Sequence, residues 1–279
     1  MPAVTERNGD GQPGDTPMDR ISFILHQLSG EFSSSDKITD EARTLLRQAR
    51  EVVDGHDDYM TEMSSPAPPI VEKMVKDGYA KDWAGLQEQG KTMYKLIPQM
   101  TAGGYEAVVL QQLARATKAE RILEIGTFTG TTTVALALVS SVKHIVALEI
   151  EPYLKENNEP FFKEAGVADK VDMRIGDALK ALDKLEEEQQ SFDMIFIDAD
   201  KPAYLKYYHK ILSGSLLAKH GMILADNTAY KASPWAPDRH YLSGSAIHDF
   251  NRAVRDDARV DVIMLPIEDG ISLIRRAGE

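Results

Sequence analysis

Short apolar runs alternate with helical stretches along the second half of the chain, from Arg121 onward. Helical spacing of apolar residues predicts helices at about 131–140, 152–165, 178–188 and 203–218. Strand–helix alternation of this kind is typical of a parallel sheet that helices cover on both faces. The apolar runs between the helices predict five parallel strands: RILEI (121–125), HIVALEI (144–150), VDMRI (171–175), FDMIFID (192–198) and GMILAD (221–226).

The last two apolar runs follow a different pattern. VDVIMLP (260–266) and ISLIRR (271–276) are separated only by the short segment IEDG, which predicts two antiparallel strands joined as a hairpin. With the five preceding strands, they predict an α/β fold with a doubly wound, mostly parallel seven-stranded sheet that ends in an antiparallel hairpin.

The first third of the chain has helical spacing and no strand pattern. Residues 1–17 are polar and rich in Gly and Pro, and we expect them to be disordered. Helices are predicted at about 18–30, 39–54, 69–77 and 82–95, the first of them ending at Gly30. The predicted organisation is a disordered N-terminus, a helical extension over residues 18–96 and a sheet domain over residues 97–279.

Composition narrows the range of partners. The chain of 279 residues carries a net charge of −12 and contains no cysteine. An acidic surface repels phosphate backbones, which disfavours a nucleic-acid partner, and the lack of cysteine excludes disulfides and thiolate sites. No apolar run reaches the roughly 18 residues that a membrane span needs. We expect a cytoplasmic protein that acts on a small molecule and does not bind membranes.

A glycine turn, EIGTFTG (124–130), lies where the first predicted strand meets the first helix. Gly126 and Gly130 allow a tight turn and close approach of a ligand to the backbone. Phe128 occupies the position of the middle glycine of a dinucleotide fingerprint, so a ligand with a carboxylate and no phosphates fits better than a pyrophosphate. Thr131 and Thr132 are candidates to bind that carboxylate, although an ordinary strand–helix turn has the same appearance.

Two later strand ends agree with a nucleoside ligand. Glu149 ends the second predicted strand, where an acid is placed to accept both hydroxyls of a ribose. GDA, at 176–178, ends the third, where an adenine ring would lie next to Asp177 and Ala178. Each signal is weak alone, but their order and spacing support one another.

Acids follow the next two predicted strands. Asp198 ends the fourth strand, Asp226 and Asn227 end the fifth, and Lys201 comes three residues after Asp198. Ligands of open α/β sheets bind at the carboxyl ends of the strands, and two carboxylates with an amide oxygen suit Mg²⁺ or another divalent cation such as Mn²⁺ or Ca²⁺. From spacing alone, a helix cap at Asp198, a turn at 226–227 and a surface lysine remain open.

With these residues in place, residues 97–276 closely resemble the cation-dependent O-methyltransferases, a family that includes caffeoyl-CoA and catechol O-methyltransferases. The longer N-terminal part is similar to longer microbial members. The family has the Rossmann-like class I methyltransferase sheet with its terminal hairpin. The matching segments are LEIGTFTG, ALEI, GDAL, FDMIFIDADK-x-x-Y, ILADNT and FNRAVRDDARVDVIMLPIEDGISLIRR.

The resemblance implies residue roles. Lys201 would be the general base, and Asp198, Asp226 and Asn227 would be the metal ligands. Thr101 lies in a segment that resembles the one closing over cofactor and metal. The residues implied to bind S-adenosylmethionine are Thr101, Glu124, Gly126, Thr132, Glu149, Asp177, Ala178, Asp198 and Asp200.

Departures from the family pattern lie near the acceptor side. AGGYEAV (102–108) stands where relatives have a segment closer to S-x-D-E-G-Q, and Ala203 stands where many have Asn. Tyr230-Lys-Ala replaces a frequent Trp-x-Gly. These changes leave the acceptor open while preserving the cofactor motifs.

The sequence therefore predicts a divalent-cation-dependent O-methyltransferase that modifies one hydroxyl of a small vicinal diol, such as a catechol-like phenol or a cyclic enediol. This mechanism needs Lys201 neutral, and burial near a cation lowers a lysine pKa. A nicotinamide-nucleotide enzyme and a non-catalytic S-adenosylmethionine-binding module remain alternatives. We expect a homodimer, with the N-terminal helices either mediating dimerisation or roofing the acceptor pocket.

Overall fold

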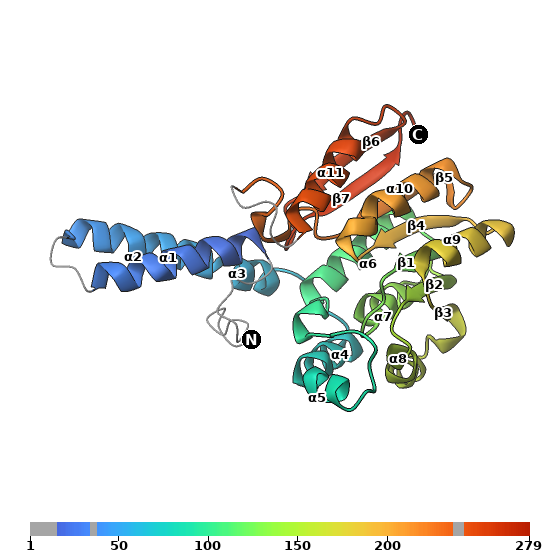
Figure 1. Cartoon of the computed structure of the whole chain (residues 1–279), viewed down its shortest axis with the longest axis horizontal. Coiled ribbons are helices and arrows are strands. Elements are labelled where there is room, and N and C mark those ends of the chain that lie inside the picture. Colours follow the sequence, from blue (N-terminus) through green and yellow to red (C-terminus); the bar gives the residue numbers. More distant parts are fainter. Residues whose placement is uncertain (1–15, 34–37, 237–242) are drawn as a thin grey trace.

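Seven strands form one mixed sheet in the computed structural model, which describes residues 16–33, 38–236 and 243–279 (Figure 1). The strand order is β3-β2-β1-β4-β5-β7-β6, with β1 to β5 parallel and β7 antiparallel to both β5 and β6. The predicted fold class is confirmed, including the terminal hairpin. The strands are β1 (Arg121–Ile125), β2 (His144–Glu149), β3 (Val171–Ile175), β4 (Phe192–Ile197), β5 (Leu217–Ala225), β6 (Val260–Leu265) and β7 (Ile271–Arg276).

Helices cover both faces of the sheet because successive residues of the inner strands point to opposite sides. In β1, Ile122 belongs to the core beneath helices α4 to α8, and Leu123 belongs to the core beneath α9 to α11. Burial on both sides explains why these strands read as continuous apolar runs. The helices are α4 (Pro69–Ala80), α5 (Trp83–Glu88), α6 (Gly104–Thr117), α7 (Thr131–Ala137), α8 (Tyr153–Glu164), α9 (Ala178–Glu187), α10 (Tyr204–Ser213) and α11 (Gly244–Arg255).

Three helices precede this body: α1 (Pro17–Ser33), α2 (Asp40–Asp54) and α3 (His56–Glu62). The disorder predicted for residues 1–17 lies outside the described residues, except at Thr16 and Pro17, where α1 begins. The boundary predicted at residue 96 stays a prediction. On its N-terminal side, Val71, Met74 and Trp83 are buried in the core shared with the sheet. None of the described helices is long and apolar enough to cross a membrane.

Two predicted helix ends near glycines are wrong. The first helix continues through Gly30 to Ser33, since a glycine inside a helix costs only about 1 kcal/mol and α2 packs alongside this part. The helix predicted at 82–95 instead ends at Glu88, and Gly90 follows with a left-handed φ of +68°. The sequence pattern also failed to predict three of the described helices, α3, α6 and α11.

The helix predicted at 203–218 is also too long. It ends at Ser213, and Gly214 then leaves the helical conformation with a ψ of −162°. The N–H of Phe192 donates to the carbonyl of Leu216 at 2.8 Å. Because of this pairing with β4, apolar residues that local spacing assigns to the helix become part of strand β5.

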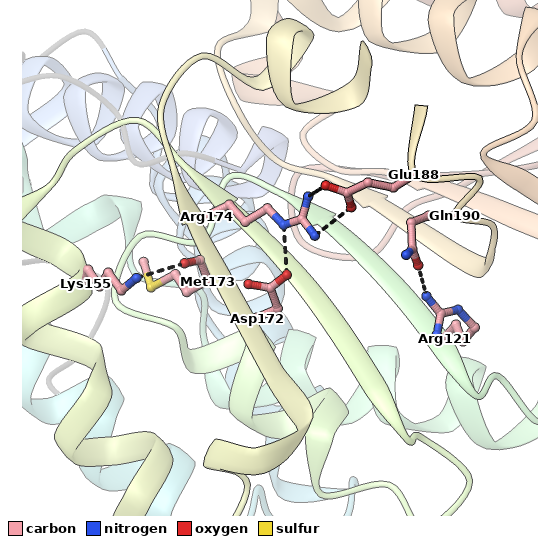
Figure 2. Close-up of polar contacts among 7 residues, drawn as sticks. All are labelled: Arg121, Lys155, Asp172, Met173, Arg174, Glu188 and Gln190. Atoms are coloured by element: carbon pink, nitrogen blue, oxygen red, sulfur yellow. Dashed lines mark hydrogen bonds and ion pairs between the residues drawn. The ribbon is translucent and has the colours of Figure 1, made fainter. Parts of the chain in front are cut away.

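The edge strand β3 is bordered by charged side chains (Figure 2). Arg174 donates to Asp172 of the same strand at 2.8 Å and forms a two-bond ion pair with Glu188 after α9, at 3.1 and 2.9 Å. Charges on an edge strand discourage pairing with another chain. The opposite edge, β6, exposes the apolar side chains of Ile263 and Met264.

The strand order reverses between β1 and β4, and the two strand ends touch there. The N–H of Asp198 donates to the carbonyl of Ile125 at 2.9 Å, while the N–H of Gly126 donates to Leu148 at 2.9 Å. Gly126 has a φ of +95°, and a Cβ at this position would lie 1.9 Å from the carbonyl oxygen of Asp198. Only glycine fits, and ligands of doubly wound sheets bind at this reversal.

We expect Gly126→Ala to lower the free energy of unfolding by about 3 kcal/mol or more, because the methyl group adds backbone strain and a clash. Gly166→Ala is the matched control, since Gly166 has a φ of +69° but a Cβ there meets nothing within 4 Å. That variant should lose only about 1–2 kcal/mol from backbone strain. Urea unfolding measures both, and equal losses would contradict a role for the Asp198 contact.

Candidate functional site

Two predicted cofactor residues contact each other beside the glycine turn. Thr132 and Thr133, in the first turn of α7, donate their hydroxyl groups to the two carboxylate oxygens of Glu124. All three side chains are buried. Burial raises the pKa of Glu124 to about 7, although the two hydroxyl donors act in the opposite direction. The hydroxyl of Thr132 thus helps to hold Glu124 in place, and its predicted contact with a cofactor stays a prediction.

Glu149 ends β2 and is fixed by the backbone around it. One carboxylate oxygen accepts from the N–H groups of Thr127 and Phe128 at 3.2 and 2.8 Å. The other accepts from Ile150 and Glu151 at 2.8 and 2.9 Å. Burial raises the pKa of Glu149 even so. The carboxylate therefore bridges the ends of β1 and β2 in one fixed orientation. A ribose hydroxyl that donated to it would share its oxygens with these backbone N–H groups.

Asp177, Ala178 and Asp200 follow the neighbouring strands. Asp177 caps α9 by accepting the N–H of Lys180 at 2.9 Å, and Ala178 begins that helix. Asp200 is exposed and accepts from the hydroxyl of Tyr207 at 2.7 Å. These carboxylates already have partners within the protein, and their contact with a cofactor stays a prediction.

Thr101 lies in the connection between α4 and α6. Its side chain is buried, and its hydroxyl has no hydrogen-bond partner within the described residues. The hydroxyl lies against Gly78 of α4, where an added Cβ would come within 2.5 Å of it. The side chain is therefore directed toward α4, and its predicted cofactor role is untested.

Lys201 joins the two acid-bearing strand ends. Its ammonium nitrogen donates to Asp198 Oδ1 at 3.1 Å, to the hydroxyl of Tyr204 at 3.2 Å and to Asn227 Oδ1. The structure thus brings together the predicted base and two predicted metal ligands. Burial lowers the pKa of Lys201, but the Tyr204 hydroxyl and the nearby carboxylates, led by Asp198 and Asp226, outweigh it and raise it above the usual lysine value.

Two further acids belong to this cluster, although the sequence did not single them out. Glu106 of α6 is buried, and burial followed by the charges of Asp198 and Asp269 raises its pKa well above the usual range. Asp269 lies in the β6–β7 turn and is also buried. Glu106 lies just after Thr101 in a segment already marked as unusual, whereas Asp269 looked like an ordinary turn residue.

Asp269 holds the amide of Asn227. The side-chain nitrogen of Asn227 donates to Asp269 Oδ2 at 2.7 Å, which leaves its oxygen directed toward Lys201. Backbone bonds bring the hairpin turn to this strand end: Ala229 N–H donates to the carbonyl of Asp269 at 2.7 Å, and Thr228 N–H to that of Gly270 at 2.9 Å. The terminal hairpin therefore sets which atom of Asn227 faces the cluster.

The cluster has more acids than local cations can balance. Around Lys201 lie the carboxyl groups of Asp198, Asp226, Glu106 and Asp269, which interact electrostatically. Asp226 Oδ1 and Glu106 Oε1 are buried and have no hydrogen-bond partner within the described residues. Burial, then repulsion from the other acids, raises the pKa of Asp226. A divalent cation fits this donor set, because it would pair with the unused oxygens and offset the repulsion.

The predicted ligand set contains two carboxylates and one amide. In the described part of the chain, no three His, Cys, Asp or Glu side chains are grouped as ligands of one ion. The cation assignment therefore depends on Asn227 as the third ligand and stays a prediction.

Comparison with known proteins places this geometry in a family. A family model described as O-methyltransferase matches residues 63–277. Caffeoyl-CoA O-methyltransferase 1 of Eucalyptus globulus is 39% identical over 186 residues, which cover 63% of this chain and 75% of the relative. Tricin synthase 1 of Oryza sativa subsp. japonica is 37% identical over 190 residues, with coverage of 63% and 75%.

Solved structures agree with these relatives. The methyltransferase PaMTH1 of Podospora anserina, bound to SAH, superposes with a TM-score of 0.68 at 26% identity, covering 81% of this chain and 96% of that one. The O-methyltransferase of Bacillus cereus in complex with SAH has a TM-score of 0.65 at 26% identity, with coverage of 79% and 96%. TomG of Streptomyces achromogenes, in complex with SAM, has a TM-score of 0.64 at 26% identity, with coverage of 80% and 96%.

These matches include the glycine turn, the acid-bearing strand ends and the terminal hairpin. They favour a methyl-transferring enzyme over the nicotinamide-nucleotide alternative. Because the family model spans most of the chain and the relatives share its sheet domain, the protein belongs to the O-methyltransferase family.

Proposed function

We propose that the protein transfers a methyl group from S-adenosylmethionine to one hydroxyl of a small vicinal diol, with the help of a divalent cation. The observation that carries the proposal is the position of Lys201 between Asp198 and Asn227, next to the glycine turn. Similarity to caffeoyl-CoA O-methyltransferases and to structures holding SAM or SAH supports it.

The cofactor would lie along the carboxyl ends of β1, β2 and β4. Glu149 supplies a preoriented carboxylate for the ribose hydroxyls, and Gly126 lets the ligand approach the backbone. Bound S-adenosylmethionine supplies a sulfonium methyl group. The protein contributes by holding donor and acceptor in line across the Gly126–Asp198 contact, because positioning accounts for much of the acceleration of such transfers.

Asp198, Asp226 and Asn227 would hold the cation. A divalent cation held there would act as a Lewis acid that makes the acceptor hydroxyl easier to deprotonate. Lys201 would then accept the hydroxyl proton at Nζ. With its neighbouring carboxylates neutralised, the attraction that raises the pKa of Lys201 weakens, and burial favours the neutral amine that a base requires.

The residues that depart from the family pattern lie on the proposed acceptor side. Lys231 and Ala232 both have left-handed backbones, with φ of 51° and 55°. Ala232 occupies the position where relatives often have Gly, a residue that adopts a left-handed conformation at little steric cost. Lys231 accepts from Arg20 of α1 through its carbonyl at 2.9 Å. We therefore place the determinants of acceptor choice in residues 229–236 and in the segment leading to Glu106.

A panel of diols and matched monophenols, incubated with S-adenosylmethionine and Mg²⁺ and read by product mass, tests the reaction. We expect single methylation of vicinal diols, none of monophenols, loss of activity in EDTA and recovery when Mg²⁺ is added in excess. Full activity in EDTA would overturn the cation requirement, and equal methylation of monophenols would overturn the diol preference.

Removing the proposed base should separate binding from chemistry. Lys201→Ala should keep S-adenosylmethionine affinity in calorimetry, while turnover falls by roughly 10²–10⁴-fold, the usual contribution of a general base. Lys206→Ala, at an exposed lysine of α10, is the matched control and should keep full turnover. Unchanged turnover in Lys201→Ala would remove its role as a base.

Asp269 provides a test that does not rely on activity. Asp269→Ala leaves the amide of Asn227 without its acceptor, so Mg²⁺ affinity measured by calorimetry should fall by roughly 10–100-fold, the range expected for partners of metal ligands. Asp269→Asn keeps an acceptor oxygen and should recover part of the affinity. Asp261→Ala, at an exposed acid in β6, is the control. Unchanged Mg²⁺ affinity in Asp269→Ala would show that the hairpin does not position Asn227.

A further inference from the structure

The connection between α5 and α6 passes along the edge of the sheet where the cofactor would lie. Its residues 92–101, which we call the strap, contain one short helical turn, η1 (Pro98–Met100). The start of the strap is bonded to Glu151, just after β2. Beyond its end, Glu106 in the first turn of α6 interacts electrostatically with Asp198 after β4. Because β1 lies between β2 and β4, the strap passes three strand ends, a span of roughly 10 Å.

Glu151 fixes the start of the strap with its carboxylate. Oε2 accepts from the backbone N–H groups of Met93 and Tyr94 at 2.6 and 3.0 Å. Oε1 accepts from the N–H of Tyr153, in the first turn of α8, at 3.1 Å. Glu151 is only 1% exposed. Hydrogen bonds to a carboxylate are stronger than those between neutral groups, so this one side chain ties a loop with little regular structure to the sheet.

The residue that holds the strap is bonded to the predicted ribose acid. Glu149 Oε1 accepts from the backbone N–H of Glu151 at 2.9 Å, while its other oxygen accepts from Thr127 and Phe128 of the glycine turn. The segment after β2 thus carries two carboxylates with different tasks, since Glu149 holds the glycine turn and Glu151 holds the strap. A ligand that bonds to Glu149 acts on the same backbone that orients Glu151.

The strap is anchored in the core at one residue and exposes several others. Leu96 is buried in the core that the sheet shares with α4 to α8. Four large apolar side chains of the strap are 71%, 43%, 40% and 48% exposed: Met93, Tyr94, Ile97 and Met100. Apolar side chains grouped beside strand ends are typical of a segment that covers a ligand.

We propose that Glu151 is a positioning residue for the cofactor: its carboxylate latches the strap across the strand ends, so that the strap covers bound S-adenosylmethionine and slows its release. With the strap already ordered, binding does not have to supply the free energy of ordering this loop. The inference rests on the use of S-adenosylmethionine in the proposed function and needs neither the cation nor the diol acceptor.

Calorimetry with S-adenosylhomocysteine tests the latch in the full chain without any turnover. We expect Glu151→Ala to weaken binding by roughly 10–100-fold, the range for hydrogen bonds to a charged group. The loss should come mostly from faster dissociation, which stopped-flow displacement measures. Glu151→Gln keeps one oxygen that can accept from Met93 and Tyr94, and it should recover part of the affinity.

Asp193 supplies a matched control, because it makes the same kind of contact at the opposite ends of the strands. Its Oδ2 accepts from the N–H groups of Glu120 and Arg121, both at 2.9 Å, at the start of β1. Asp193→Ala should lower the urea midpoint, as Glu151→Ala does, but leave the affinity for S-adenosylhomocysteine unchanged. A purely structural role of Glu151 predicts that both variants keep their affinity. Glu151→Gln and Asp193→Asn repeat the comparison with smaller changes if Glu151→Ala does not fold.

Hydrogen exchange reports on the strap directly. In the wild type, S-adenosylhomocysteine should slow exchange over residues 91–97, whereas in Glu151→Ala this segment should exchange fast with and without ligand. Unchanged affinity in the Glu151 variants, an equal loss in the Asp193 variants, or protection of the strap that does not depend on Glu151 would overturn the latch and leave the proposed function intact. A wild type that does not bind S-adenosylhomocysteine would overturn both.

Discussion

The close contact between Gly126 and the carbonyl of Asp198 is the constraint on which the site depends. It lies where the strand order reverses, so it joins the turn that follows β1 to the acids that follow β4. On one side of the contact lie Glu124 and Glu149, fixed by hydroxyl and backbone donors. On the other lie Lys201 and its acceptors. A residue with a side chain at position 126 would push apart the two halves that a methyl transfer has to align.

An imbalance of charge shapes the part of the site around Lys201. Four carboxyl groups surround one ammonium group, and two of their oxygens are buried without hydrogen-bond partners among the described residues. An arrangement of this kind is costly for a protein that binds nothing, because buried charges repel and lose hydration. The proposed cation would offset this cost. The same carboxylates, together with the Tyr204 hydroxyl, raise the pKa of Lys201 above its usual value despite burial.

The terminal hairpin has a role in the site as well as in the sheet. Its turn supplies Asp269, which orients Asn227, and its strand β7 pairs antiparallel with β5, so that the turn reaches the end of β5. At the opposite end of the chain, Arg20 of α1 donates to the carbonyl of Lys231, which follows β5. Segments from both ends of the sequence thus contact the residues that follow β5.

Sequence patterns alone were enough to predict the sheet, the glycine turn and the acids at the strand ends. These depend on local spacing, and parallel strands necessarily bring their carboxyl ends to one edge. Local spacing was wrong about the helix end at Gly30, where α1 continues because it packs on α2. It was also wrong about residues 214–218, which leave the helix because this segment pairs with Phe192. Only the tertiary structure placed Glu106 and Asp269 beside Lys201, because no local pattern relates a residue of α6 to one in a hairpin turn. It likewise showed that Ile24 and Leu28 of α1 are exposed, since helical periodicity identifies an apolar face but not what covers it.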